Sequence, residues 1–245
     1  MQRSQIKKFF STAGQAVLPV IHVLDHGQTE RNVGIAIKEG AAGVFLINHD
    51  FDVETFLPII KSVRAAWPGI WLGVNFLAVT GKTAFPVLAN LEKEGCVVDG
   101  YWADDARIDE RRDPDDQLEA AEILAVKKRC GWNGLYFGGT AFKKQRSVNP
   151  RDYQLSAAIA ANWMDVVTTS GVATGKETGS DKVDAFRTGL GENALALASG
   201  VTPENIGKYA DDVDIILVAT GINLGDDFYN IDQKRLTKLI DQTGN

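Results

Sequence analysis

The histidines are the residues of this chain best suited to do chemistry, and all three fall where an apolar segment ends. His22 lies in the first such segment, His26 follows it, and His49 follows the second segment. Aspartate and asparagine residues also occur where these apolar segments end. Polar side chains at the C-terminal ends of barrel strands are more often catalytic or binding than structural. The candidate catalytic residues are His22, Asp25, His49 and Asp104.

A histidine beside a carboxylate suits acid-base chemistry. A carboxylate such as Asp25 that accepts from one ring nitrogen of His22 would fix the tautomer and raise the basicity of the other nitrogen. An alternative set, His26, His49 and Asp50, would bind a divalent metal. The spacing His22-x-x-Asp25-His26 matches no tight metal motif, so acid-base chemistry ranks ahead of metal binding, with a purely structural network close behind.

Other polar residues at the predicted strand ends are candidates for substrate binding. Asn48 and Asn75 hold equivalent positions, which suits orienting a sugar hydroxyl or a carbonyl; the alternative is a hydrogen-bonded layer at the barrel mouth. Lys143 would form a Schiff base with a carbonyl substrate or offset a phosphate charge, whereas its neighbour Lys144 favours a solvated pair. Ser170 offers a hydroxyl to a substrate.

Two glycine-bearing turns predict a phosphate site. Both follow apolar segments in the C-terminal part of the chain, and glycine lets the backbone approach a ligand closely. In a (β/α)8 barrel, phosphate is held by the loops after strands 7 and 8, where free N–H groups favour an anion. Ordinary turn chemistry is the alternative. The predicted phosphate-binding residues are Ser199, Gly200, Val201, Thr220, Gly221 and Ile222.

Eight strand-helix units, counted along the chain, must position these residues. Continuous apolar strands indicate a parallel sheet buried on both faces. Eight units favour a closed (β/α)8 TIM barrel over an open doubly wound sheet, and no GxGxxG follows the first strand. The predicted strands are 17–24, 43–48, 71–77, 97–102, 134–142, 165–170, 195–200 and 215–221. The predicted helices are 28–40, 53–67, 85–95, 115–131, 152–163, 181–191, 203–210 and 233–240.

We expect a single domain over residues 1–245, with a short amphipathic helix around SQIKKFF covering the bottom of the barrel. The loop 170–180 is rich in glycine and suits a mobile lid. The charged loop 104–116 is interpreted as a solvated loop.

Composition excludes several classes of protein. The chain has 26 basic and 32 acidic residues and no long basic block, which argues against nucleic acid as a partner. No apolar run approaches the roughly 18 residues of a membrane span, and the N-terminus lacks the apolar core of a signal peptide. We therefore expect a cytoplasmic protein. Assembly into a homo-oligomer is an expectation from fold-level analogy alone.

The last third of the chain resembles the BtpA/SgcQ family. The matching segments are Thr169–Gly171 with Thr174–Gly175, Ser199–Asn205, Val218–Thr220, and Ile231–Asp232 with Arg235. Upstream, FLINHDFDVETF is similar to the family's ENFGD segment, with Asn48 and Asp52 retained and the glutamate replaced. The resemblance implies a (β/α)8 barrel of the phosphate-binding TIM-barrel superfamily. It implies no single reaction: one member is associated with photosystem I biogenesis, and some similar chains carry a phosphoribosyltransferase label.

These observations predict an enzyme that acts on a phosphorylated sugar or nucleotide-like small molecule. The expected chemistry is of the isomerase, aldolase or lyase type, next to a carbonyl group. Alternatives are glycosyl or phosphoribosyl transfer on the same barrel, and a non-catalytic BtpA-like assembly factor. No organic cofactor is indicated, and a divalent metal stays an open alternative.

Overall fold

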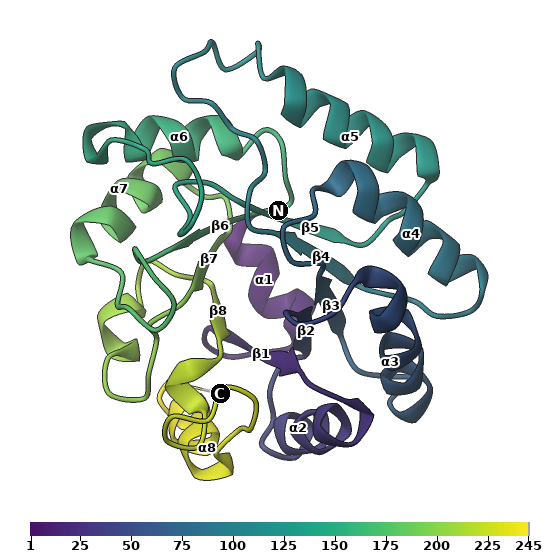
Figure 1. The fold of residues 1–245 in the computed structure, drawn as a ribbon. Helices are drawn as coiled ribbons and strands as arrows, with labels where there is room; N and C mark the ends of the chain where they lie inside the picture. The colour runs from purple at the N-terminus through teal and green to yellow at the C-terminus, as the bar shows by residue number, and fades with distance from the viewer. Residues whose placement is uncertain (245) are drawn as a thin grey trace.

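Eight parallel strands pair in sequence order and close into a barrel, which confirms the predicted (β/α)8 fold (Figure 1). The computed structural model describes residues 1–244; the last residue of the predicted domain range, Asn245, lies outside the described residues. Pairing of Ala16 with Ile215 brings the first strand beside the last and closes the barrel. The strands are β1 (Ala16–Val23), β2 (Val44–Asn48), β3 (Leu72–Asn75), β4 (Gly100–Ala103), β5 (Leu135–Gly139), β6 (Val166–Ser170), β7 (Leu195–Ala198) and β8 (Ile215–Val218).

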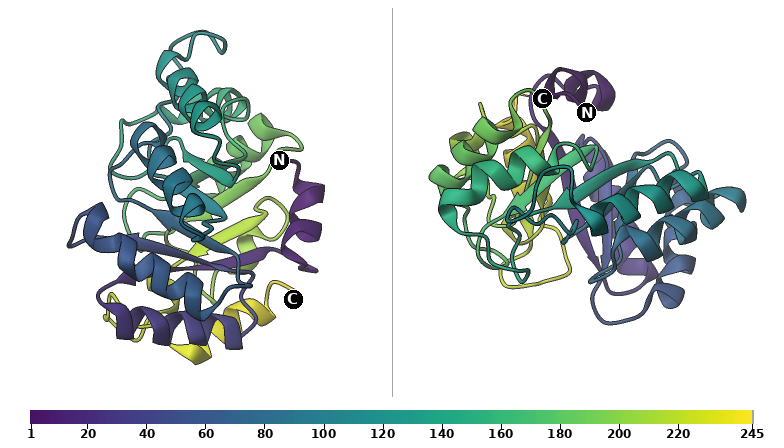
Figure 2. Two further views of the ribbon diagram at one scale, coloured as in Figure 1. Left: turned by 90° about the vertical axis from the view of Figure 1, so that its right-hand side faces the viewer. Right: turned by 90° about the horizontal axis from the view of Figure 1, so that it is seen from above.

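Helices surround the barrel on its outer side (Figure 1). They are α2 (His26–Lys38), α3 (Val53–Ala66), α4 (Gly81–Lys93), α5 (Leu118–Cys130), α6 (Tyr153–Ala160), α7 (Ser180–Leu190) and α8 (Gln233–Asp241), whereas α1 (Arg3–Phe10) lies across one end of the barrel (Figure 2). Three short 3-10 helices, η1 (Pro150–Asp152), η2 (Ile206–Tyr209) and η3 (Thr220–Ile222), lie in the connections. Within the described residues, no helix is both long and apolar enough to cross a membrane.

The predicted N-terminal helix is present as α1. It lies at one end of the barrel, near both termini (Figure 2). Its buried residues Ile6 and Phe10 join the apolar cluster that fills the barrel interior. This end is opposite the C-terminal ends of the strands, so α1 covers the bottom of the barrel, as expected.

The predicted α-helix 203–210 is wrong in type and start. Only residues Ile206–Tyr209 are helical, and they form a 3-10 helix. The preceding turn is held by local side chains: Thr202 Oγ1 accepts from the Glu204 amide at 3.1 Å, and Asn205 Oδ1 accepts from the Thr202 amide at 2.8 Å. Such side-chain-to-backbone bonds compete with helical hydrogen bonds.

Alternation along the strands decides which residues face the interior. In β1, Ala16, Leu18 and Val20 belong to the interior cluster, whereas Val17 and Ile21 pack with the outer helices. Because successive side chains point to opposite faces, His22 continues the inward series. The same alternation turns residues 49 and 104 toward the interior, after Phe45 and Ile47 in β2 and Trp102 in β4.

Candidate functional site

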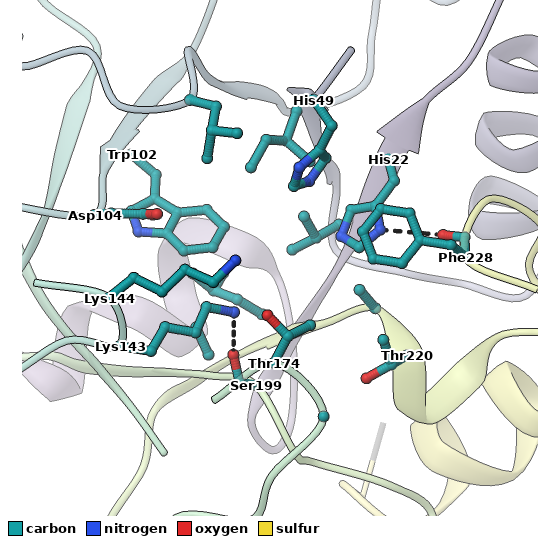
Figure 3. Close-up of a pocket in the computed structure, with 17 residues that line it drawn as sticks. His22, His49, Trp102, Asp104, Lys143, Lys144, Thr174, Ser199, Thr220 and Phe228 are labelled. Carbon is teal, nitrogen blue, oxygen red and sulfur yellow. Dashed lines mark hydrogen bonds between the residues drawn. The ribbon is translucent and has the colours of Figure 1, made fainter. Parts of the chain in front are cut away.

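A cavity opens at the C-terminal ends of the strands (Figure 3). Its empty volume is about 630 Å³, including the part open to solvent. The polar wall consists of His22, His49, Trp102, Asp104, Lys143, Lys144, Thr174, Ser199 and Thr220. The apolar wall includes Val20, Ile47, Leu77, Leu217 and Phe228. Polar groups thus converge on a largely apolar hollow.

His22 is held as a neutral imidazole. Its Nδ1 lies 3.1 Å from the Phe228 carbonyl oxygen, and because a carbonyl only accepts, Nδ1 must carry the proton. The His22 ring lies against Phe228 at a centroid distance of 3.8 Å, with the two rings tilted by 35°, and meets His49 edge-on at 4.8 Å. Burial and the neighbouring His49 lower the pKa of His22 to about 3. Its Nε2 is therefore a hydrogen-bond acceptor and a weak base.

His49 carries a buried nitrogen without a partner. Within the described residues, no hydrogen bond is made by its Nε2. Burial lowers the pKa of His49, and the Asp50 carboxylate opposes that shift. Asp50 itself accepts a 2.6 Å hydrogen bond from the Tyr229 hydroxyl, which ties the loop after β8 to the end of β2. His49 is therefore available to bind a ligand.

Asp104 is a partly buried carboxyl group held by Asn75. The Asn75 amide donates to Asp104 Oδ1 at 3.0 Å. Burial raises the pKa of Asp104, while this hydrogen bond and the nearby lysines oppose the rise. Asn75 is 1% exposed and does not line the cavity, so its predicted role in binding substrate is replaced by the positioning of Asp104.

Two consecutive lysines enter the cavity from the loop after β5 (Figure 3). Lys143 Nζ lies 2.5 Å from Ser199 Oγ, and the Lys143 amide donates to Ser170 Oγ at 2.9 Å. Ser170 is fully buried and lies outside the cavity lining, so it supports the loop that carries Lys143. Burial lowers the pKa of Lys143, and the Asp104 carboxylate opposes this. Lys144 is exposed at the rim.

Two predicted site residues have structural roles. Asp25 caps α2, its Oδ1 accepting from the Gln28 amide at 2.7 Å, so it does not orient His22. Asn48 lies on the outward face of β2 and bonds only backbone groups: it donates to the Phe51 carbonyl at 2.6 Å and accepts from the Leu77 amide at 3.1 Å. Asp25 is outside the cavity because it caps α2, and Asn48 is outside it because it faces outward from β2.

The alternative metal set is not assembled. His26 begins α2 and is exposed to solvent, apart from His49 in the cavity wall. No group of three or more His, Cys, Asp or Glu side chains able to hold a metal ion occurs within the described part of the chain.

The two predicted phosphate turns lie side by side, and only their first residues reach the cavity. Ser199 and Thr220 line it, whereas Gly200, Val201, Gly221 and Ile222 do not. A Cβ on Gly221 would lie 1.9 Å from the Val201 carbonyl oxygen, and one on Gly200 would lie 2.2 Å from that of Lys176. The loop after β6 therefore covers Gly200, and in these two turns only the hydroxyl-bearing residues Ser199 and Thr220 reach the cavity.

The amide groups of these turns differ in availability. The Ile222 amide donates to the Ala219 carbonyl at 2.9 Å, so it is not free for phosphate as predicted. The amides of Gly200, Val201 and Gly221 make no hydrogen bond within the described residues. The loop 170–180 reaches the cavity, since Thr174 and Gly175 line it.

Several non-glycine residues with a left-handed backbone lie at the same rim of the barrel. Ala141, Lys144 and Ser199 have φ values of 46°, 59° and 72°, in the left-handed region that non-glycine residues rarely adopt. Such residues cost about 1–3 kcal/mol each and cluster at ligand sites. The strain supports a binding role for the loop after β5 and the turn after β7.

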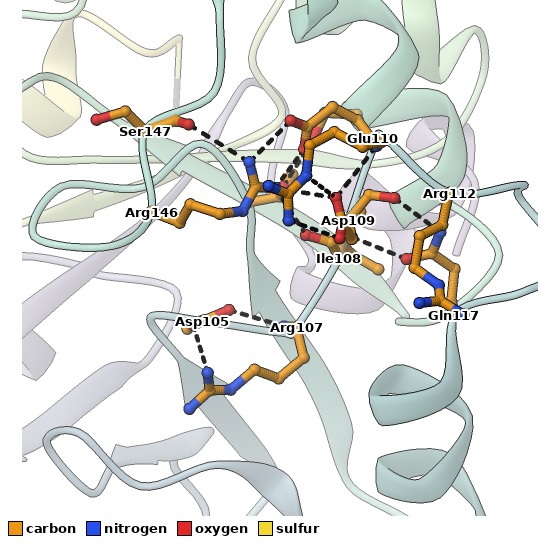
Figure 4. Close-up of polar contacts among 12 residues, drawn as sticks. Asp105, Arg107, Ile108, Asp109, Glu110, Arg112, Gln117, Arg146 and Ser147 are labelled. Atoms are coloured by element: carbon orange, nitrogen blue, oxygen red, sulfur yellow. Dashed lines mark hydrogen bonds and ion pairs between the residues drawn. The ribbon is translucent and has the colours of Figure 1, made fainter.

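An ion-pair network joins the loops that carry Asp104 and Lys143 (Figure 4). Arg146 donates to both carboxylate oxygens of Glu110, whose side chain is 4% exposed, and to the Ile108 carbonyl. The charged loop 104–116 is therefore partly a fixed support and not only a solvated segment. The network fixes the loop that carries Asp104 relative to the loop that carries Lys143.

Several residues of the cavity wall were not predicted as site residues from the sequence, among them Trp102, Lys144, Thr174 and Phe228. Trp102 occupies an inward-facing position of β4, so the alternation of the strand could have identified it as a residue of the cavity wall. Phe228 lies in an acidic loop far along the chain, and nothing in the spacing links it to His22.

No protein-family model matches the chain, and no curated protein matches it either. Solved structures of similar fold include tryptophan synthase subunit alpha from Legionella pneumophila str. Paris, with a TM-score of 0.69, 14% identity, and coverage of 100% of this chain and 99% of that one. A native KDPGal structure gives a TM-score of 0.60, 12% identity and coverage of 92% of each chain. Phosphoribosyl anthranilate isomerase from Thermus thermophilus gives 0.58, 12% identity, and coverage of 93% and 98%. These likenesses show the barrel fold.

Proposed function

We propose that this chain is an enzyme that acts on a small phosphorylated molecule at the barrel mouth, by proton transfer next to a carbonyl group. One observation carries the proposal. The buried nitrogens Trp102 Nε1 and His49 Nε2 lack partners within the described residues and belong to the wall of one cavity, together with Lys143 and Asp104. Buried polar atoms are nearly always hydrogen-bonded in folded proteins, so two unpartnered nitrogens in the wall of one cavity support a ligand there.

The ionisable groups of the cavity support isomerase, aldolase or lyase chemistry. Burial raises the pKa of Asp104 and lowers that of Lys143, so each group is shifted toward its uncharged form. Groups shifted in this way serve as acids, bases and nucleophiles near neutral pH. The neutral His22 suits hydrogen bonding to a substrate oxygen better than proton abstraction, since a base works best with a pKa near the working pH.

The phosphate group would be bound on the side of β7 and β8. Lys144, which lines the same cavity, would supply positive charge, and the hydroxyls of Ser199 and Thr220 would supply hydrogen bonds. The free amides of Gly200 and Gly221 lie next to these hydroxyls and become accessible if the loop after β6 moves. Phosphoribosyl anthranilate isomerase, one of the proteins of similar fold, is named for a phosphorylated substrate.

A thermal-shift screen tests this proposal. Ribose 5-phosphate, dihydroxyacetone phosphate and phosphoribosyl pyrophosphate should each be compared with their unphosphorylated counterparts. A ligand at about 100 times its Kd adds about 2.7 kcal/mol of stability, which is easily detected. Lys144→Met should reduce the shift, whereas Lys234→Met, an exposed lysine on α8, should not.

The opposite outcome is equally clear. No shift with any phosphorylated compound would refute the phosphate site and favour the non-catalytic role implied by the BtpA/SgcQ resemblance. The surface gives no separate support for that role. The exposed large apolar residues, among them Phe9, Ile37, Leu118 and Leu155, are spread over α1, α2, α5 and α6.

A further inference from the structure

Lys143 differs from the paired lysines of the chain. Within residues 1–244, five lysines form ion pairs with carboxylates: Lys61, Lys82, Lys127, Lys208 and Lys238. Lys143 is half-buried in the cavity wall and forms no ion pair within the described residues. Its Nζ contacts a neutral hydroxyl, Ser199 Oγ, at 2.5 Å. A partly desolvated amine without a carboxylate partner gives up its proton more readily than the paired lysines do.

The backbone around Lys143 is fixed from two sides. The Lys143 amide donates to Ser170 Oγ at 2.9 Å. The Lys182 ammonium on α7 donates to the carbonyls of Ala141 at 2.6 Å and Ser170 at 2.7 Å. Lys182 thus joins the loop after β5 to the end of β6. The amine of Lys143 is therefore presented to the cavity from a firmly held loop.

An acid for the reaction lies in the same cavity. Asp104 influences the pKa of Lys143 but does not approach within ion-pair distance of it. The Asn75 amide holds Asp104 Oδ1 at 3.0 Å. Burial shifts the pKa of Asp104 upward, in the direction that favours a protonated carboxyl. A carbonyl group placed between the two would meet an amine on one side and an acid on the other.

Resting on the proposed enzymatic function, we propose that Lys143 forms a Schiff base with an aldehyde or ketone group of the substrate. Its neutral amine attacks the carbonyl carbon, forming the C–N bond while a proton moves from nitrogen to the former carbonyl oxygen. The carbinolamine then loses water: Asp104 protonates the departing hydroxyl, and the nitrogen electron pair forms the C=N bond. The resulting iminium withdraws electrons from the adjacent carbon, which eases cleavage of a C–H or C–C bond there.

Trapping with borohydride tests the proposal on the full chain. The protein is incubated with dihydroxyacetone phosphate or ribose 5-phosphate, reduced with sodium borohydride, digested and analysed by mass spectrometry. The expected adduct lies on Lys143 and adds the mass of the carbonyl compound less one oxygen atom. Lys143→Met should lose it, while Lys234→Met should retain it. Circular dichroism and Tm establish that both variants fold.

A second arm does not depend on knowing the substrate. Formaldehyde with cyanoborohydride methylates amines through the same imine, and it is small enough to enter any open cavity. At pH 7, Lys143 should be methylated faster than the exposed Lys234. Equal or slower methylation would overturn the proposal, because the amine would then have no special reactivity.

The two arms separate this inference from the proposed function. If the phosphorylated carbonyl compounds raise Tm but no adduct forms on Lys143, the Schiff-base step is refuted and phosphate binding stands. If no compound raises Tm and Lys143 is nevertheless methylated fastest, the phosphate site fails and the reactive amine stands.

Discussion

Lowering the pH should destabilise the protein through His22. Burial and the neighbouring His49 lower its pKa from 6.5 to about 3, so the folded state holds the ring neutral while the unfolded chain binds a proton. For a group whose pKa is lower in the folded state, the stability contribution is complete above pH 6.5. It is lost as the pH falls toward 3.

The size of the effect follows from the structure. His22 is 7% exposed, so solvent screens it little. Each pH unit between the two pKa values is worth about 1.36 kcal/mol, which gives a loss of about 2.7 kcal/mol at about pH 4.5. This is a large part of the about 5–15 kcal/mol that stabilises a typical domain.

Urea unfolding at pH 7.5 and 4.5 measures the effect in the wild type, His22→Gln and His26→Gln. Glutamine can still donate to the Phe228 carbonyl, so the substitution removes the titration and keeps a hydrogen bond. The stability advantage of the wild type over His22→Gln should shrink by about 2.7 kcal/mol between the two pH values. The exposed His26 is the control, and its variant should follow the wild type. An advantage that stays constant with pH would show that His22 takes up a proton without unfolding, and the reasoning would fail.

Three further predictions follow from single contacts. Asp104→Asn should raise the free energy of unfolding at neutral pH, because burial raises the pKa of Asp104 and its ionisation opposes folding; the gain should vanish below the ordinary carboxyl pKa, as urea unfolding against pH would show. Arg146→Met should lower the free energy of unfolding by about 1–3 kcal/mol, because it leaves the Glu110 carboxylate unpaired. The double variant with Glu110→Gln should recover part of this free energy in the same assay. Gly200→Ala should lower Tm, since its φ is +73° and the added Cβ would lie 2.2 Å from the Lys176 carbonyl oxygen; an unchanged Tm would mean that the loop after β6 moves aside freely.

The sequence was enough to predict the barrel, because each strand is a continuous apolar run and each helix has an apolar stripe. It also placed His22, His49 and Asp104 at one rim. The structural roles of Asn48 and Asp25 could also have been predicted. Strand alternation places Asn48 on the outer face of its strand, and Asp25 occupies the N-cap position of the following helix. Both signals were present in the sequence.

The remaining features depend on contacts between distant segments. Phe228 lies against His22 although 206 positions separate them, and no periodicity encodes that meeting. The loop after β6 covers Gly200 because the Lys176 backbone packs on its Cα. Loop conformations of this kind are set by tertiary packing, so the sequence predicted a phosphate cradle made of amides where the cavity wall is made of hydroxyls.

The unfavourable features of the rim argue for a working site over an inert barrel. Left-handed Lys144 and Ser199, unpaired Trp102 Nε1 and His49 Nε2, and the partly buried amine of Lys143 each reduce stability. Within the described residues, neither Trp102 Nε1 nor His49 Nε2 has a hydrogen-bond partner, and the amine of Lys143 contacts a neutral hydroxyl, Ser199 Oγ. A binding partner that accepts from the indole N–H, bonds His49 and meets the amine would offset several of these costs at once. Stability that rises on ligand binding, and rises less in variants of these same residues, is therefore the behaviour that separates an enzyme from a barrel kept only for its shape.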